Sequence, residues 1–299
     1  MSYPKRVAVT ESSARDGLQS LGAFVPTEAK SALINDLAAA GLTTFDAAAF
    51  VDPKRVPQMA DGAEVVKGVH ADVDLFGLAP NMRGLEMAVE ARVTGVGVLT
   101  AASDAFNKRN INATVDESMR RIERMLADGP ADIRYRAYIS TATHCPYEGE
   151  QDPARVARLA EELAGWGAEA VVLGETIGKA TVAHVERLLD EVLDRVPVEM
   201  VGVHFHDTYG QALANTAAAL ARGIDKMDSS AGGLGGCPFA PGAAGNLATE
   251  DLLWLLDGMG IEHGVDARRV AAAAHKFCDR HNIAYGSKAG RALMSEGEA

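Results

Sequence analysis

The strongest constraint on the fold is the regular alternation of short apolar segments with longer helical segments along the chain. The apolar segments are short and rich in branched residues, which is typical of strands buried in a parallel sheet. Eight such strands are predicted at Val7–Thr10, Thr44–Ala48, Leu75–Leu78, Gly95–Thr100, Arg134–Ser140, Ala170–Leu173, Met200–His206 and Lys226–Ser229. Helices are predicted between them, among others at Thr27–Ala40, Met82–Ala91, Val115–Asp128, Pro153–Trp166, Thr181–Arg195 and Gln211–Arg222.

Eight strand-then-helix units are the number that closes a parallel barrel, and such barrels typically need about 250 residues. The chain has 299 residues. We therefore predict a (β/α)8 TIM barrel over about residues 5–260, followed by C-terminal helices over 261–299, the whole of 1–299 forming a single catalytic domain. An open doubly wound sheet is the alternative, but no G-x-G-x-x-G follows the first strand.

Composition narrows the class of partner. The formal net charge is −12, from 29 basic and 41 acidic residues. This balance argues against nucleic acid and against anionic membrane surfaces, which both need clustered positive charge. No apolar run approaches the length of a membrane-spanning helix, and the first residues lack the apolar core of a signal peptide. We expect a cytoplasmic protein that acts on a small molecule.

Polar residues gather where the predicted strands end, which is where barrel enzymes place their active sites. The first strand is followed by Glu11, Arg15, Asp16 and Gln19. Asp46 lies toward the end of the second strand, Glu175 follows the sixth, and the seventh ends in His204-Phe205-His206. The eighth leads into a glycine-rich segment that contains Cys237 and Asn246.

The H-x-H pair is the most informative of these groups. Residues two apart in a strand face the same side, so His204 and His206 can point to one site. Two imidazoles together with Asp16 form a plausible ligand set for Mg²⁺ or Mn²⁺. Asn246 fits the same set, and it fits a loop-closing turn equally well.

Cys237 lies in a loop with too much glycine to form a packed core. Glycine gives such a loop hinge freedom, which suits a lid over a site, and a thiol there can act as an acid, a base or a nucleophile. The other two cysteines, Cys145 and Cys278, fit small buried hydrophobic positions better. Three scattered cysteines give neither a disulfide framework nor a thiolate zinc site.

Four segments together resemble the 3-hydroxy-3-methylglutaryl-CoA lyase family, within the superfamily of metal-dependent acyl-CoA lyases and synthases. They are RDGLQ, FVDPKRVPQMAD at 50–61, HDTYGQALAN and GGLGGCPFAPGAAGNLATEDL. They occur in the order that the family shows and extend from the first strand to about Met259. The first and third elements are shared with condensing synthases, whereas the cysteine loop points to the lyases.

The resemblance implies a role for each matching residue. Asp16, His204, His206 and Asn246 would hold the divalent cation. Arg15 would stabilise the enolate, and Cys237 would transfer a proton. Glu11, Gln19, Asp46 and Glu175 would support or bind the acyl-CoA substrate. A homodimer is expected on the same basis.

The reaction implied is a retro-Claisen cleavage of a 3-hydroxyacyl-CoA to acetyl-CoA and, for the family substrate, acetoacetate. The residues leave three candidates for the group that takes the hydroxyl proton: Asp16, His204 and Cys237. Lys108, Arg109 and the residues around Ser287 and Lys288 are candidates for the CoA phosphates. For Lys108 and Arg109 a solvated surface charge is the better explanation.

The chain departs from the family pattern at several strand ends. Ser12-Ser13-Ala14 replaces V-G-P, Ser20-Leu21-Gly22 replaces Asn-Glu-Lys, Asp46 with three alanines replaces Glu-Thr-Thr-Ser, and Glu175 replaces an aspartate. We therefore expect the metal chemistry to persist while the acyl group can differ, with malyl-, methylmalyl- or citramalyl-type thioesters as alternatives. A condensing synthase is a less favoured alternative, as is a non-catalytic binding protein, which would have lost some of these residues.

Overall fold

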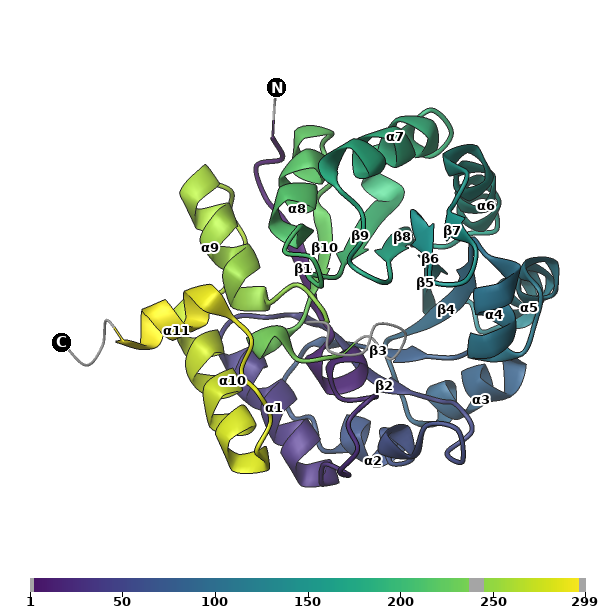
Figure 1. Ribbon diagram of the computed structural model, residues 1–299. Helices are drawn as coiled ribbons and strands as arrows, with labels where there is room; N and C mark the ends of the chain where they lie inside the picture. The colour runs from purple at the N-terminus through teal and green to yellow at the C-terminus, as the bar shows by residue number, and fades with distance from the viewer. Residues whose placement is uncertain (1–2, 237–244, 296–299) are drawn as a thin grey trace.

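Eight parallel strands close into a barrel surrounded by helices in the computed structural model, which describes residues 3–236 and 245–295 (Figure 1). Around the ring the strands follow the order β1, β10, β9, β8, β5, β4, β3 and β2, and every neighbouring pair is parallel. Their bounds are β1 Ala8–Glu11, β2 Thr44–Ala49, β3 Asp74–Leu78, β4 Gly95–Ala101, β5 Arg134–Ser140, β8 Ala170–Glu175, β9 Val201–Phe205 and β10 Lys226–Ser229. The predicted barrel is confirmed.

Helices pack on the outside of this ring and bury one face each against it. They are α1 Thr27–Ala39, α2 Gly62–Lys67, α3 Met82–Glu90, α4 Asp104–Ile111, α5 Val115–Asp128, α6 Pro153–Gly165, α7 Val182–Leu193, α8 Ala212–Ala221 and α9 Thr249–Met259. Local sequence explains several ends: Thr114 and Glu117 form a reciprocal capping box on α5, and Asp152 accepts from the backbone at the start of α6. Among the described helices, none is both long and apolar enough to cross a membrane.

Two further helices follow the barrel, as the sequence predicts. They are α10 Ala267–His281 and α11 Lys288–Ser295, and α10 packs against α1. Cys278 is buried within α10 and Cys145 is buried in a short hairpin, so both cysteines have the small hydrophobic role that we expected. The hairpin pairs β6 His144–Cys145 with β7 Gly149–Glu150 after strand β5.

A buried polar contact crosses the barrel interior. Nη1 of Arg136 on β5 donates to Oγ1 of Thr10 on β1 at 2.5 Å, and Nη2 lies 3.1 Å from Oδ1 of Asp228 on β10. In the strand order β5 and β1 lie on opposite sides of the ring. A buried guanidinium needs such partners, because an unpaired buried charge is strongly destabilising. Asp228 is the register partner of His204 on β9, so the ion pair lies beside that histidine.

Candidate active site

The turn after β1 carries the first site residues. Ser13–Gly17 form a short π-helical turn, a geometry that recurs at functional sites. The carboxylate of Glu11 is buried and accepts from the backbone N–H groups of Ser13 and Ala231, each at 2.9 Å. It also accepts from Oγ1 of Thr249 at 2.6 Å. Glu11 therefore fixes the turn to the segment after β10 and to the start of α9.

Asp16 is the centre of a hydrogen-bond network on this turn. Its Oδ1 accepts from Nη1 of Arg15 at 2.5 Å and from Nε2 of Gln19 at 2.7 Å. Its Oδ2 accepts from Nδ2 of Asn246 at 2.9 Å and lies 3.8 Å from Nε2 of His204. Burial alone would raise the pKa of Asp16, but Arg15 and the two histidines lower it to about 2. The carboxylate is therefore ionised at neutral pH.

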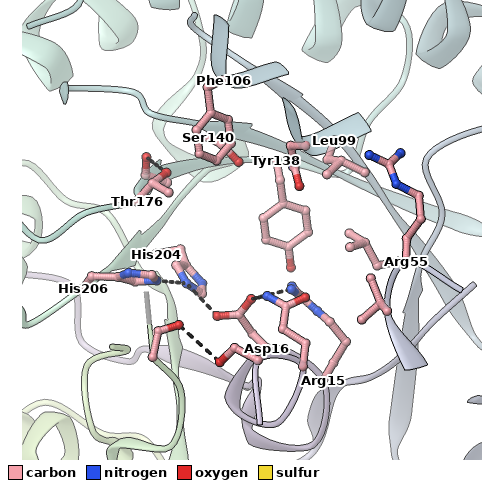
Figure 2. A pocket seen from close by; sticks show the side chains of 17 residues that line it. Arg15, Asp16, Arg55, Leu99, Phe106, Tyr138, Ser140, Thr176, His204 and His206 are labelled. Carbon is pink, nitrogen blue, oxygen red and sulfur yellow. Dashed lines mark hydrogen bonds and ion pairs between the residues drawn. The ribbon is translucent and has the colours of Figure 1, made fainter. Parts of the chain in front are cut away.

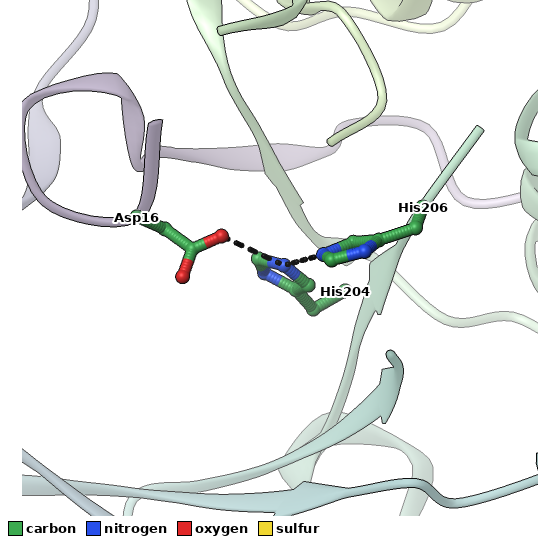
Figure 3. A group of neighbouring side chains, drawn as sticks. All are labelled: Asp16, His204 and His206. Atoms are coloured by element: carbon green, nitrogen blue, oxygen red, sulfur yellow. Dashed lines mark hydrogen bonds and ion pairs between the residues drawn. The ribbon is translucent and has the colours of Figure 1, made fainter. Parts of the chain in front are cut away.

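His204 and His206 point to the same place, as their spacing predicts. Their Nε2 atoms are 3.3 Å apart, and His204 lies between Asp16 and His206 (Figure 3). One ligand atom from each of the three residues lies within 4.8 Å of the others. Burial and the neighbouring His204 lower the pKa of His206 to about 4, so this ring is neutral, as a metal ligand must be.

Asn246 adds an amide group beside these three side chains. It is buried and forms an isolated bridge with His206, and its Nδ2 donates to Asp16 and to the carbonyl of Leu234 at 3.1 Å. Its Oδ1 is buried without a hydrogen-bond partner among the described residues. Because a buried amide oxygen is normally satisfied, this atom fits a divalent cation. The contacts favour the ligand interpretation over a simple loop-closing turn.

The second nitrogen of His204 is also held. Its Nδ1 lies 3.3 Å from Oδ2 of Asp228, the carboxylate that pairs with Arg136. Burial alone would lower the pKa of His204, but Asp228 and Asp16 raise it above its usual value. A carboxylate behind a metal-binding imidazole fixes the ring and its tautomer. Sequence analysis did not identify Asp228 or Arg136, because their roles depend on contacts between strands that are far apart in the chain.

A cavity of about 320 Å³ opens beside this centre (Figure 2). Its polar lining includes Arg15, Asp16, Gln19 and both histidines. Its apolar lining comes from Val56, Leu78, Leu99, Phe106 and the ring of Tyr138. Figure 2 shows Tyr138 pointing toward Arg15 and Asp16, and its buried hydroxyl has no hydrogen-bond partner among the described residues. The pocket thus joins a charged end to an apolar wall.

Comparison with known proteins agrees with this geometry. The pattern of the HMGL-like family matches residues 6–276. The chain belongs to the HMGL-like family. It is 46% identical to the mitochondrial hydroxymethylglutaryl-CoA lyase of Bos taurus over 97% of this chain and 90% of that protein. It is 45% identical to the 3-hydroxy-3-isohexenylglutaryl-CoA/hydroxymethylglutaryl-CoA lyase of Pseudomonas aeruginosa over 99% and 100%.

A solved relative supports the same assignment. The HMG-CoA lyase of Acinetobacter baumannii, in complex with coenzyme A and 3-methylmalate, superposes with a TM-score of 0.92 at 33% identity, covering 98% of this chain and 96% of that one. These relatives confirm the sequence-based prediction of a carbon–carbon lyase of the hydroxymethylglutaryl-CoA lyase type.

Only one of the four predicted substrate-binding residues of this HMGL-like chain lies in the described pocket lining. Gln19 lines the pocket, whereas Glu11, Asp46 and Glu175 are absent from the described lining. Asp46 is buried and accepts from Nε of Arg15 at 2.6 Å, so it positions that guanidinium. Glu175 accepts from Oγ1 of Thr143 at 3.2 Å and from backbone N–H groups at residues 179 and 180. Burial raises its pKa to about 6.

The three alanines after Asp46 pack within strand β2. Ala47, Ala48 and Ala49 are buried in β2 and are absent from the described lining. Their small size allows α2 to approach closely, since a Cβ at Gly62 would lie 3.2 Å from that of Ala48. Close packing of α2 against β2 is therefore one consequence of these small residues.

Most of the residues predicted to bind the CoA phosphates already contact other residues of the HMGL-like chain. Arg109 lies over the ring of Tyr147, at 4.3 Å from the ring centre, and Lys108 is exposed on α4. The hydroxyl of Ser287 is buried and donates to Asp251, so it is already used. Lys288 Nζ lies 3.6 Å from Asp207.

The pocket rim instead includes Arg55, which sequence analysis missed, and Asn110. Arg55 lies within the 50–61 segment that carries the family resemblance, so a basic residue in that loop was the available signal. Cys237 lies outside the described residues, so its predicted role stays a prediction.

Proposed function

We propose that this HMGL-like lyase cleaves the C2–C3 bond of 3-hydroxy-3-methylglutaryl-CoA, giving acetyl-CoA and acetoacetate. The observation that carries the proposal is the convergence of Asp16, His204 and Asn246 from both ends of the chain, beside Arg15 in one pocket. The names and coverage of the relatives support the same substrate. The whole of 1–299 acts as one catalytic domain in this proposal, as a cytoplasmic homodimer.

Asp16, His204, His206 and Asn246 would hold Mg²⁺ or Mn²⁺. When bound, the cation supplies a Lewis acid that lowers the pKa of the 3-hydroxyl and anchors the distal carboxylate. The protein's part is to hold these ligands in place. Asp228 orients His204, and Gln19 and Arg15 orient Asp16.

Arg15 would stabilise the enolate that forms when the bond breaks. Its guanidinium is permanently charged and is held in place by Asp46 and Asp16, so it needs no rearrangement to meet a developing negative charge. The hydroxyl proton would pass to one of the three candidate acceptors, Asp16, His204 or Cys237, as the ketone forms, and C2 of the acetyl-CoA enolate would gain a proton. Cys237 would supply this second proton, a role that rests on the family resemblance.

The coenzyme A portion would enter across the rim that Arg55 and Asn110 form. Arg55 carries a positive charge at an exposed position, which suits a phosphate group without requiring burial of charge. The coenzyme A in the related solved structure supports an acyl-CoA ligand for this family.

The direct test is acetyl-CoA release from 3-hydroxy-3-methylglutaryl-CoA by the purified protein with Mg²⁺ or Mn²⁺. We expect release that a chelator abolishes and that added metal restores. Asp16→Asn and His206→Ala should both lose Mg²⁺ binding in the pocket and turnover, while the exposed variant His70→Ala retains both. Release that continues without metal, or a folded metal-bound protein that releases nothing, would overturn the proposed reaction.

The apolar wall favours a second candidate within the same chemistry. Leu78, Leu99 and Phe106 line the pocket with apolar side chains, and the Pseudomonas aeruginosa relative is named for an isohexenyl substrate as well. A longer 3-alkyl group would bury further surface here. Comparing kcat/KM across 3-methyl and 3-isohexenyl thioesters, and across malyl, methylmalyl and citramalyl ones, ranks the candidates. A clear preference for the 3-methyl compound would remove the others.

A further inference from the structure

Two histidines and a glutamate meet on the barrel rim, away from the pocket. His144 opens β6 and faces Glu150 in the antiparallel register of the hairpin, and His184 lies in the first turn of α7. One ligand atom from each residue lies within 4.8 Å of the others. The two rings meet edge to face, with centres 4.7 Å apart. None of the three is in the described pocket lining.

His144 gives independent evidence for a missing partner. The residue is only 7% exposed, and its Nδ1 is buried without a hydrogen-bond partner among the described residues. Buried polar atoms are normally satisfied, so this one requires an explanation. Burial and the neighbouring His184 lower the pKa of His144, which keeps the ring neutral and able to donate a lone pair.

Nε2 of His184 faces the cluster while Thr181 holds the other ring nitrogen. Oγ1 of Thr181 lies 2.9 Å from Nδ1 of His184, and the backbone N–H of Thr181 donates to the same nitrogen at 3.2 Å. In the tautomer that accepts this bond, the ring proton is on Nε2, which lies 4.0 Å from Oε1 of Glu150. A dication at Nε2 would replace that proton, and the proton would then lie on Nδ1, where Oγ1 of Thr181 accepts it and the backbone bond is lost.

A neighbouring arginine competes with a metal ion for the carboxylate of Glu150. Nη2 of Arg187 lies 2.5 Å from Oε1 of Glu150, and the positive charges of Arg187 and Lys179 both act on His144. The side chain of Arg187 is 57% exposed and can move into solvent. Binding of a dication to Glu150 would therefore break only its ion pair with Arg187. A surface ion pair of this kind contributes little to stability.

From this geometry we propose that His144, Glu150 and His184 form a second metal site that binds Zn²⁺ or a similar transition-metal dication. Two imidazoles and one carboxylate, with water in the fourth position, are a common zinc donor set. The site joins the hairpin after β5 to the helix after β8, and these strands are neighbours in the ring. Thr143, next to His144, also donates to Glu175 at the end of β8. The bound metal stabilises this part of the rim, and the inference does not depend on the lyase activity.

The test is a calorimetric Zn²⁺ titration of the full chain after chelator treatment, with Co²⁺ absorption as a second readout. The wild type should bind one equivalent more than His184→Ala. Glu150→Gln should bind that equivalent at least about tenfold more weakly. Arg187→Ala should bind it more tightly, because the competing cation is gone. His70→Ala, an exposed histidine outside the cluster, serves as the matched control and should behave as the wild type.

A second comparison separates the two metal centres. His206→Ala should keep the rim equivalent of Zn²⁺, and His184→Ala should keep Mg²⁺-dependent turnover. Equal Zn²⁺ stoichiometry and affinity in the wild type, His184→Ala and Glu150→Gln would overturn the proposal. Complete loss of Zn²⁺ binding in folded His206→Ala would overturn it as well. Since His144 is buried, His144→Asn is used only once circular dichroism shows a folded protein.

Discussion

Oδ2 of Asp228 lies 3.3 Å from Nδ1 of His204, while Arg136 holds the other oxygen of the same carboxylate at 3.1 Å. The imidazole is thus fixed from behind by a carboxylate that is itself fixed from across the barrel. This arrangement leaves Nε2 of His204 facing His206 and Asp16. The geometry of the proposed metal centre therefore depends on residues outside the described pocket lining.

The first prediction concerns Asp228→Asn. An amide cannot supply the charge that orients and polarises His204, so the dissociation constant for Mn²⁺ should rise about 10- to 100-fold. The buried Arg136 also loses its charge partner, so the free energy of unfolding should fall by about 3–5 kcal/mol. Calorimetric metal titration and chemical denaturation measure the two effects.

Asp225→Asn is the matched control, since Asp225 is partly exposed beside Lys226. Unchanged metal affinity in a folded Asp228→Asn protein would contradict the orienting role.

The second prediction concerns Arg15→Lys. Lysine keeps the charge but cannot donate to Asp46 and Asp16 with a planar fork. We expect kcat to fall by about 10²- to 10³-fold, the size of effect seen when one oxyanion donor is removed. Steady-state kinetics with saturating metal measures this, and Arg124→Lys on the exposed face of α5 is the control. A change confined to KM would instead indicate a binding role.

The third prediction concerns Cys237→Ser, and it rests on the family resemblance. A hydroxyl is a much poorer acid than a thiol, so kcat should drop by orders of magnitude with little change in KM. Cys278→Ala serves as the comparison, because Cys278 is buried in α10 away from the pocket lining that the structure describes. Near-normal turnover in Cys237→Ser would remove this cysteine from the chemistry.

The fourth prediction concerns pH and Glu250. Glu250 is fully buried at the start of α9, where both carboxylate oxygens lie 2.9 Å from the N–H of Gly232 and Oε1 accepts from Tyr285 at 2.8 Å. Burial outweighs these bonds and raises the pKa of Glu250 to about 7. Between its usual pKa and this value, the folded state retains a proton that the unfolded state releases. Stability therefore falls as pH rises through this window, by about 3 kcal/mol in total.

Comparison with Glu250→Gln isolates this effect, since glutamine stays neutral throughout. The free energy of unfolding of the wild type, relative to that of Glu250→Gln, should fall between pH 4.5 and pH 7.5. Denaturation curves at several pH values measure it, and the exposed variant Glu64→Gln provides the control. A difference that stays constant, or rises with pH, would show that Glu250 is ionised in the folded state.

The barrel and most of its strands could be predicted from the sequence, because buried parallel strands are short apolar segments that local composition identifies. Lys226–Ser229 and Arg134–Ser140 have the predicted bounds, and Val115–Asp128 is the predicted helix. Short elements were missed. Helices α2 and α4 have six and eight residues, too few for a clear helical period.

The site was predictable where it depended on spacing and not where it depended on contacts across the barrel. His204 and His206 share a face because of strand geometry alone, which a sequence displays directly. Whether Asn246 turns toward Asp16 depends on a contact between residues 230 positions apart, and spacing does not encode it. The same reason hid Arg136, whose partners lie on β1 and β10.

The wide separation of Asp16 from His204, His206 and Asn246 also sets the order of events during synthesis. A growing chain holds a single one of these four proposed ligands until the seventh barrel strand has emerged, and the last follows β10. The cation therefore cannot stabilise a partly folded barrel, because its proposed ligands come together only when the first and last strands pair. The cation would bind only after the barrel has closed. Bound metal should therefore slow unfolding and leave the folding rate nearly unchanged.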